Sequence, residues 1–345
     1  MLIKKAILTG GGRATRLYPL TTTTNKHLLP LANKPMIFHA IEKVVEAGVE
    51  EIFINTNPGE EELQKHIRDG GHWGISIKFF EQTGGPQGIA HVVNEAKRFI
   101  GDDPFMFYLS DNILFGGIKE LVREFTKGGY DCMLTLAKVP DPSRFGVPVF
   151  DETLSLVDVV EKPETPPNDF AVTGIYLYGP KVFFEAFNNI EKSARGEYEI
   201  SSIHSYFLKN NKKVGYKEIT GWWKDTGKVE DLLLANQLLL EKMDAAIKIS
   251  PTSLVADNVK LIAPVMIGEN CQLENCIIGP NVTVGAGSVI KNAAIENSIL
   301  LSNVEIDCAV CVADSLIGKD VKFVKKEARQ KKHKLIVGDK TIIEI

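Results

Sequence analysis

From residue 4 to about residue 139, short apolar runs alternate with stretches whose apolar residues recur with the period of a helix. The first of these stretches places Ile37, Ile41, Val44 and Val45 on one face, and Gly48 follows its end. The apolar runs are rich in β-branched and aromatic residues, which predicts buried strands at residues 6–10, 50–56, 77–82, 105–111 and 132–139. Strands and helices that alternate in this way are typical of an α/β fold with a mostly parallel sheet.

The next stretch, from residue 140 to about residue 226, has a different pattern. It mixes apolar runs with turns rich in proline and glycine, such as residues 161–169. We expect this stretch to form a lid on the same sheet, and insertions of this kind usually shape a substrate pocket.

A six-residue repeat begins after a predicted helix that starts near residue 231. Aliphatic residues recur at almost every sixth position, at Val255, Leu261, Ile267, Leu273, Ile278, Val284 and Ile290. Pairs of an aliphatic residue and a glycine also recur, at Ile267-Gly268, Ile278-Gly279, Val284-Gly285 and Ile317-Gly318. One short strand and one tight turn per step predict a parallel β-helix. The alternative is a β-sandwich, which would alternate with period two and have uneven turns.

Two domains are therefore expected in the 345 residues. Residues 1–240 would form the α/β domain. Residues 241–345 would hold the end of a linker helix, the β-helix and a C-terminal tail. The basic stretch at residues 325–334 is interpreted as a solvated face, and a final strand follows it.

Charge and hydropathy exclude several kinds of partner. The formal net charge of -4 and the pI near 6.0 argue against a nucleic-acid binder, which would be strongly basic. No apolar run approaches the ~20 residues of a membrane span, and the N-terminus resembles a buried strand more than a signal peptide. We expect a cytoplasmic protein that binds nucleotides, without a nucleic-acid or membrane partner.

Four of the five cysteines lie in the repeat region, at Cys271, Cys276, Cys308 and Cys311. An odd number in a long chain is typical of reduced thiols and not of a disulfide framework. Four thiolates can bind zinc, but small buried side chains are expected at these positions, so packing is favoured over a zinc site.

A glycine-rich turn follows the first predicted strand. Gly10, Gly11 and Gly12 allow backbone N–H groups to approach an anion, and Arg16 and Lys26 add positive charge nearby in the sequence. Such a turn can hold a triphosphate and stabilise the charge that develops during phosphoryl transfer. The spacing matches neither the Rossmann fingerprint nor the Walker loop, and a merely tight turn is the alternative.

Eight motifs then follow one another in a family-specific order. The chain reads GGGRATRLYPLT, NKHLLPLANKPM, LSDN, RFGVPVF, VVEKP, AVTGIYLY, GEYEISS and WWKDTG. Together they resemble the glucose-1-phosphate thymidylyltransferases, over roughly residues 7–236, and the added β-helix is similar to the long form of that family. The resemblance implies a Rossmann-like nucleotidyltransferase domain followed by a left-handed β-helix of hexapeptide repeats. It also implies Mg²⁺-assisted transfer from dTTP to a sugar 1-phosphate, with release of pyrophosphate.

The resemblance assigns catalysis to Arg16, Lys26, Asp111 and Asp225. It places both aspartates on the Mg²⁺ ion, and hard oxygen ligands suit that metal. Asp111 also stands at the end of a predicted strand, where open α/β sheets bind ligands. Without the resemblance, a helix cap at Asp111 and an Asx-type turn at Asp225 would be the favoured interpretations.

The remaining site residues are also implied by the resemblance. Those expected to bind the nucleotide are Gly10, Gly11, Gly12, Thr15, Gln82, Gly88 and Asn112. Those expected to bind the sugar phosphate are Gly146, Glu161, Lys162 and Val172. Lys162 would bind the phosphate and Glu161 would accept sugar hydroxyls, while Gln82 would read the base and Gly88 would leave room for its ring.

The chain departs from the family pattern at three places. The glycine turn contains one residue more than usual and has Ala14 before Thr15. The base loop has one extra residue between Gln82 and Gly88. A histidine, His27, stands where glutamine is common, and such a lone histidine is more often packed or close to phosphate than catalytic.

Three other functions remain open. One is UTP-dependent uridylyl transfer, although the segment from Asn25 to Pro30 fits it less well. Another is a bifunctional enzyme with an acetyltransferase β-helix, but His333 is the only histidine from residue 250 onward. The third is a non-catalytic binding protein on the same fold. For the β-helix we favour a role in assembly, so a homo-oligomer is expected.

Overall fold

The computed structural model describes residues 2–12, 14–244, 246–324, 332–333 and 335–344. The chain packs into two compact units. The first unit comprises residues 1–12 and 39–223, and the second comprises residues 13–38 and 224–345. Residues 13–38 and 224–240 thus belong with the β-helix, while the expected domain boundary at residue 240 stays a prediction. Most of the basic stretch at residues 325–334 lies outside the described residues.

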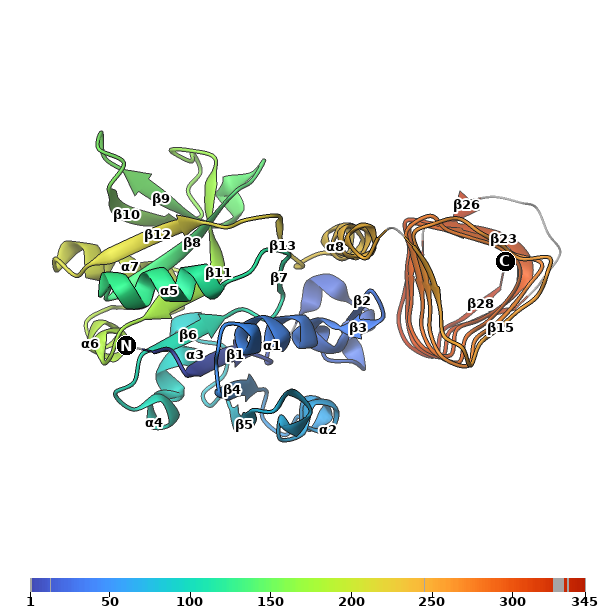
Figure 1. Cartoon of the computed structure of the whole chain (residues 1–345), viewed down its shortest axis with the longest axis horizontal. Helices are drawn as coiled ribbons and strands as arrows, with labels where there is room; N and C mark the ends of the chain where they lie inside the picture. The colour runs from blue at the N-terminus through green and yellow to red at the C-terminus, as the bar shows by residue number, and fades with distance from the viewer. Residues whose placement is uncertain (1, 13, 245, 325–331, 334, 345) are drawn as a thin grey trace. The chain divides into compact units, whose positions relative to one another are not determined.

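A seven-stranded mixed sheet is the centre of the first unit (Figure 1). Its strand order is β12-β8-β11-β6-β1-β4-β5. The bounds are β1 (Lys5–Thr9), β4 (Glu51–Thr56), β5 (Ser76–Glu81), β6 (Phe105–Tyr108), β8 (Cys132–Lys138), β11 (Phe170–Tyr178) and β12 (Val214–Glu218). The pairs β6–β1, β1–β4, β4–β5 and β12–β8 are parallel, whereas β11 is antiparallel to both of its neighbours. The five predicted strands and the mostly parallel sheet are therefore confirmed.

The helices of the first unit cover this sheet. They are α2 (Glu62–Ile67), α3 (Ile89–Glu95), α4 (Lys97–Ile100), α5 (Lys119–Gly128), α6 (Val182–Phe187) and α7 (Ile200–Lys209), with 3-10 turns η4 (Gly71–Trp73) and η5 (Pro142–Arg144). The first predicted helix is α1 (Met36–Glu46), which runs from the second unit into the first. Of the four residues predicted on its buried face, Ile37, Ile41 and Val44 are fully buried, and Val45 is half-buried.

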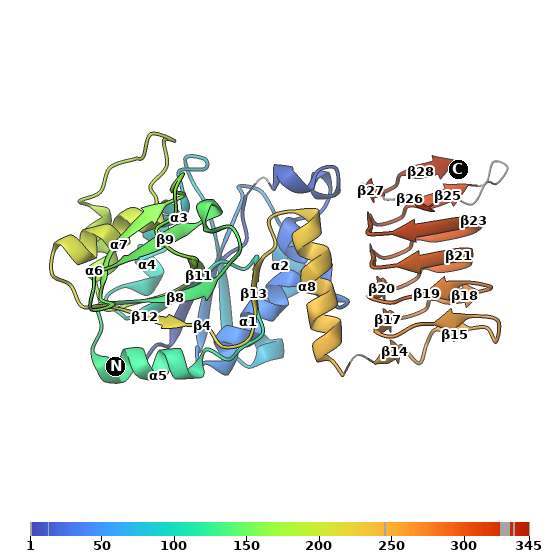
Figure 2. The same cartoon turned by 90° about the horizontal axis from the view of Figure 1, so that it is seen from above.

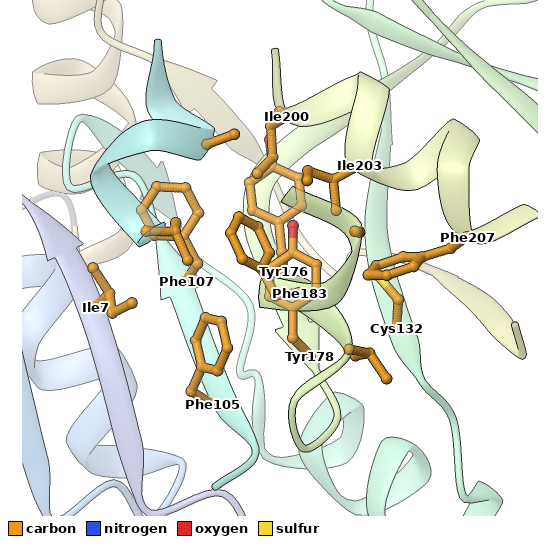
Figure 3. Close-up of a cluster of buried hydrophobic side chains, with 14 of the residues drawn as sticks. Ile7, Phe105, Phe107, Cys132, Tyr176, Tyr178, Phe183, Ile200, Ile203 and Phe207 are labelled. Atoms are coloured by element: carbon orange, nitrogen blue, oxygen red, sulfur yellow. The ribbon is translucent and has the colours of Figure 1, made fainter. Parts of the chain in front are cut away.

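An aromatic core lies between the sheet and helices α3, α6 and α7. Figure 3 shows Phe105 and Phe107 of β6, Tyr176 and Tyr178 of β11, and Phe183 of α6 close together. Their rings pack at centroid distances such as 5.3 Å for Phe105–Tyr178 and 5.0 Å for Tyr178–Phe183. This core fixes β6, which leads into the loop of Asp111, and β11, which carries Val172.

The expected lid is only partly confirmed. Two short strands, β9 (Gly146–Phe150) and β10 (Leu156–Glu161), form a separate antiparallel ribbon. In contrast, β11 and β12 of the same stretch belong to the main sheet. β11 is almost entirely buried, so its long apolar run pairs inside the sheet instead of covering it. Two other short strands are β7 (Asn112–Leu114), which precedes this stretch, and β13 (Trp223–Asp225), which lies at its end.

The second unit contains a parallel β-helix, whose strands stack in register (Figure 2). One face has the order β14-β17-β20-β22-β24-β27, and another has β15-β18-β21-β23-β25-β28. A third row joins β16 to β19, β19 to the second half of β21, and β26 to the second half of β23. The bounds are β14 (Ile247–Ile249), β15 (Leu254–Val255), β16 (Lys260–Leu261), β17 (Val265–Ile267), β18 (Gln272–Glu274), β19 (Ile277–Ile278), β20 (Val282–Val284), β21 (Val289–Glu296), β22 (Ile299–Leu300), β23 (Glu305–Ala313), β24 (Leu316–Ile317), β25 (Lys322–Val324), β26 (Lys332–His333), β27 (Ile336–Val337) and β28 (Ile342–Glu344).

The six-residue repeat supplies the interior of the β-helix. Ile267, Leu273, Ile278, Val284 and Ile290 are all buried in one cluster. Three of the four cysteines share this interior: Cys271, Cys276 and Cys308 are at most 5% exposed, which agrees with the packing role, whereas Cys311 is half-buried. Across the described residues, no group of three or more His, Cys, Asp or Glu is arranged to hold a metal ion.

The rest of the second unit is a long helix and a segment from the N-terminal part of the chain. The helix is α8 (Val229–Lys242), which packs against the short strand β2 (Pro30–Leu31). Residues 13–38 contain η1 (Thr15–Leu17), η2 (Leu20–Thr22), η3 (Lys26–Leu28) and the hairpin of β2 (Pro30–Leu31) and β3 (Lys34–Pro35). Within the described parts of the chain, no helix has the length and apolarity needed to cross a membrane.

Candidate active site

The glycine turn follows β1 and packs tightly against β4 and the residues after it. A Cβ at Gly10 would lie 2.6 Å from the carbonyl oxygen of Asn55, so no side chain fits there. The N–H of Gly10 donates to Asn55 Oδ1 at 3.1 Å, and that of Gly12 donates to Asn57 Oδ1 at 3.0 Å. Asn57 Nδ2 donates back to Gly12 O at 3.3 Å. These asparagines shape the turn and were not identified from the sequence.

Asp111 follows β6, the parallel neighbour of β1, so it and the glycine turn lie at the carboxyl ends of adjacent strands. The two loops are joined because Ser110 N donates to Thr9 Oγ1 at 2.8 Å. This is the edge at which open α/β sheets bind ligands. The alternative of a helix cap at Asp111 is wrong, since a strand and not a helix follows it.

Asn112 holds Asp111 in place. Its side chain is 3% exposed, and Nδ2 donates to Asp111 Oδ1 at 3.0 Å. Its Oδ1 accepts from Gly174 N at 2.9 Å and from Trp223 Nε1 at 2.8 Å. The predicted contact of Asn112 with nucleotide stays a prediction, while the observed bonds make it an anchor of the carboxylate.

A buried phenol also supports this loop. Tyr108 donates its hydroxyl to the carbonyl of Asn112 at 3.0 Å. Burial, and then the negative charge of Asp111, raise the pKa of Tyr108 well above its usual value. The phenol therefore stays neutral and acts as a hydrogen-bond donor.

Three of the four predicted catalytic residues belong to the second unit, and two of them meet there. A Cβ at Gly227 would lie 3.1 Å from Asp225 Oδ2 and 3.2 Å from Arg16 Nη1. The guanidinium and the carboxylate thus lie beside the same glycine. Thr15 is the first residue of η1, which carries Arg16, and its carbonyl accepts from Tyr18 N at 3.2 Å.

Lys26 begins the short turn η3. The turn is capped by Asn25, whose Oδ1 accepts from His27 N at 2.8 Å. His27 is 4% exposed, and its Nδ1 lies 3.0 Å from the same Asn25 oxygen. This agrees with a packing role for His27, and the cap fixes the backbone on both sides of Lys26.

Residues predicted to bind the sugar phosphate lie together in the first unit. A Cβ at Gly146 would lie 3.5 Å from Glu161 Oε2 and 3.9 Å from Val172 Cβ. Gly146 and Glu161 face each other across the β9–β10 ribbon, and Val172 comes from β11. Lys162 Nζ lies 3.2 Å from Glu161 Oε1. The sequence prediction thus grouped four residues that the fold brings into one place.

A second cation, Arg195, completes this cluster and was missed from the sequence. Its Nη2 lies 3.5 Å from Glu161 Oε1 and 2.7 Å from Glu199 Oε1, and its Nε donates to Glu199 at 3.1 Å. Burial lowers the pKa of Arg195, but the bonds and charges of Glu199 and Glu161 raise it overall, so the guanidinium stays charged. Its place directly before the GEYEISS motif was the available signal.

The predicted base loop is anchored at both ends. Gln82 follows β5, and its N–H donates to the carbonyl of Thr56 at 2.9 Å. Thr83 N donates to Glu95 Oε1 of α3 at 2.9 Å. A Cβ at Gly88 would lie 2.5 Å from Tyr198 O, and its φ is +93°. The backbone therefore requires glycine at position 88, whether or not a base binds there. The role of Gly88 beside the base stays a prediction.

Protein-family models cover most of the chain. A nucleotidyl transferase model matches residues 5–242, and a model of the GMPPB C-terminal domain matches residues 261–344. The low-salt glycan biosynthesis nucleotidyltransferase of Haloferax volcanii is 36% identical over 335 residues, covering 91% of this chain and 92% of the relative. The glucose-1-phosphate thymidylyltransferase of Streptomyces antibioticus is 34% identical over 355 residues, covering 99% of each.

Solved structures give the same picture for the catalytic part. A Bacillus anthracis structure in complex with a sucrose, described as a glucose-1-phosphate thymidylyltransferase, has a TM-score of 0.64 and 37% identity, covering 68% of this chain and 94% of that one. A UDP-glucose pyrophosphorylase complexed with UDP-glucose has a TM-score of 0.62 and 25% identity. The match covers 70% of this chain and 100% of that one.

The fold and these matches define an enzyme of the nucleotidyltransferase class. The chain belongs to the nucleotidyl transferase family, and within it to the group that contains the glucose-1-phosphate thymidylyltransferases. Enzymes of this family generally use a divalent metal ion. Carboxylate oxygens are ligands that such divalent ions take. Asp111 in the first unit and Asp225 in the second each offer these oxygens, and their joint binding of one ion stays a prediction.

Proposed function

We propose that the protein transfers a thymidylyl group from dTTP to glucose 1-phosphate, or a close sugar 1-phosphate, and releases pyrophosphate. The observation that carries this proposal is the cluster of Gly146, Glu161, Lys162 and Arg195. A carboxylate that accepts sugar hydroxyls beside two cations that bind phosphate suits a sugar phosphate. The name of the Streptomyces antibioticus relative, aligned over the whole chain, supports the same substrates.

The proposed reaction is an in-line displacement at the α-phosphorus. A phosphate oxygen of the sugar phosphate forms a bond to that phosphorus, and the bond to the bridging oxygen of pyrophosphate breaks, with its electron pair leaving on pyrophosphate. No general base is needed, since the nucleophile is already an anion. Arg16 and Lys26 stabilise the charge that develops on the α-phosphate and the leaving group.

We assign the divalent metal as Mg²⁺, held by Asp111 and Asp225. When bound, the ion neutralises charge on the phosphate oxygens. The chain's own contribution is to hold the two carboxylates in place. Asn112 does so for Asp111, and Asp225 stands at the end of β13, beside Gly227.

Replacing Lys162 with methionine is expected to raise the KM for glucose 1-phosphate by about 10–100-fold, because one charge-assisted phosphate contact of about 1.5–3 kcal/mol is lost. The KM for dTTP should change little. Steady-state pyrophosphate release at varied concentrations of each substrate measures both values. Lys138→Met is the matched control, since Lys138 is exposed beside Asp169. An unchanged KM for glucose 1-phosphate in Lys162→Met would contradict the assignment.

Base selectivity is proposed to favour dTTP over UTP. Gln82 offers a donor and an acceptor to a pyrimidine edge, which suits thymine and uracil alike. The similarity to a UDP-glucose pyrophosphorylase makes UTP the competitor to test. Comparing kcat/KM for the two triphosphates decides between them, and a clear preference for UTP would overturn the thymidylyl assignment.

An acetyltransferase β-helix receives no support from the structure. Residues 250–324 contain no histidine, and the one histidine from residue 250 onward, His333, lies in β26, which pairs with β23. Turnover of acetyl-CoA with glucosamine 1-phosphate would nevertheless show such an activity directly.

We also propose that the protein is a cytoplasmic homo-oligomer that associates through its β-helix. Light scattering at micromolar concentration tests this, and a monomer would contradict it.

A further inference from the structure

The segment that carries Lys26 is attached to the β-helix on both sides of that lysine. All of these residues belong to the second unit. On one side, the hydroxyls of Thr23 and Thr24 donate to Asp339 Oδ2 at 2.6 and 3.1 Å. On the other side, Asn33 Nδ2 donates to the carbonyls of Met266 and Val284 at 3.3 and 3.0 Å.

Asp339 is itself fixed within the β-helix. Its Oδ1 accepts from the N–H of Lys319 at 2.9 Å, which joins two successive coils. The neighbouring Gly338 lies directly against the segment, because a Cβ there would be 3.2 Å from Pro19 Cβ. The carboxylate therefore joins a rigid coil to the threonines that precede Lys26.

The contact at Asn33 involves the face formed by β17, β20, β22 and β24. Ile299 of β22 and Leu316 of β24 do not belong to the interior cluster, yet they are 0% and 1% exposed. This face of the β-helix is therefore covered. The hairpin that bears Asn33 is fixed at a second point, where Ala32 N donates to Asn236 Oδ1 of α8 at 2.8 Å.

From these contacts we propose that the β-helix is a positioning element for the phosphate-binding segment, with Asp339 and Asn33 as its positioning residues. The inference rests on the proposed role of Lys26. Residues 25–32 connect the two attachment points and include the capped turn η3, so displacement of either point displaces Lys26. A small misplacement of a group that contacts the transition state can cost up to about 10²-fold in rate.

The test uses the full-length protein with Asp339→Ala, and Asn33→Gly as an independent variant. Glycine suits position 33, since its φ is +56°. Asp307→Ala is the matched control, because Asp307 also accepts a bond between coils, from Asn292 at 2.7 Å. Both positioning variants should lower kcat/KM for dTTP about 10-fold or more, while the KM for glucose 1-phosphate stays within about 2-fold of the wild type. Asp339→Asn, which keeps one acceptor oxygen, should recover part of the loss.

Hydrogen exchange of the backbone amides of residues 20–29 provides a readout that does not depend on the reaction. Exchange there should be faster in Asp339→Ala than in Asp307→Ala, with equal melting temperatures. Wild-type kinetics and exchange in Asp339→Ala would overturn the proposal, as would equal effects in Asp339→Ala and Asp307→Ala. If the wild-type protein releases no pyrophosphate from any nucleotide and sugar phosphate, the proposed function fails, and the exchange result still decides the positioning role.

Discussion

Arg16→Ala is expected to lower kcat/KM for dTTP by about 10³-fold. Arginines that stabilise transition-state charge in phosphoryl transfer contribute on the order of 10³–10⁵ in rate. The guanidinium lies beside Gly227 together with Asp225, so it is positioned within the same unit as one of the carboxylates. Steady-state pyrophosphate release with dTTP and glucose 1-phosphate measures the loss.

Two companion variants separate the charge of Arg16 from its geometry. Arg16→Lys should recover only part of the activity, because an ammonium cannot reproduce the planar fork of a guanidinium. Arg123→Ala is the control, since Arg123 lies on the surface and pairs with Glu120 one turn away. Full activity in Arg16→Ala would remove Arg16 from the mechanism.

Asp111→Asn is the second change with a large expected effect. The substitution keeps the shape of the side chain and removes its charge, and kcat should fall about 10²–10³-fold, as for the loss of one electrostatic stabiliser. Asp111 lies at the ligand-binding edge of the sheet and is held by Asn112. The Mg²⁺ concentration needed for half-maximal rate should rise at the same time.

The control for Asp111 is Asp103→Asn, an exposed carboxylate that pairs with Lys5 at 2.8 Å. Its kcat and Mg²⁺ dependence should match the wild type. If Asp111→Asn retained both wild-type values, neither metal binding nor charge stabilisation could be assigned to Asp111. A non-catalytic protein on this fold would show the same result.

Local pattern was sufficient to predict the strands and the β-helix. Continuous apolar runs reflect strands buried on both faces of the sheet, and the six-residue spacing places one inward-facing residue on each successive strand of the β-helix, so the sequence pattern alone located them. The lid prediction failed for β11 because a turn-rich stretch can still contain a long buried strand. Its place in the sheet, paired with β8 on one side and β6 on the other, depends on residues far away in the sequence.

The site was predictable where a motif carried it and not where contacts bridge distant segments. Glu161 and Lys162 came from one motif, but Arg195 reaches them only through the fold. Likewise, Asn57 bonds to Gly12 across 45 residues of sequence, and Asp339 bonds to Thr23 across 316. Gly88 was expected to leave room for a base, whereas a close approach to the backbone of Tyr198 already requires glycine there.

The most direct test of the proposed function is a matrix of dTTP, UTP, ATP and GTP against glucose 1-phosphate, glucosamine 1-phosphate and mannose 1-phosphate, measured by pyrophosphate release with Mg²⁺. The highest kcat/KM is expected for dTTP with glucose 1-phosphate, and activity should disappear when the metal is chelated. Release that is absent from every pair, or fastest with UTP or with a purine triphosphate, would contradict the account.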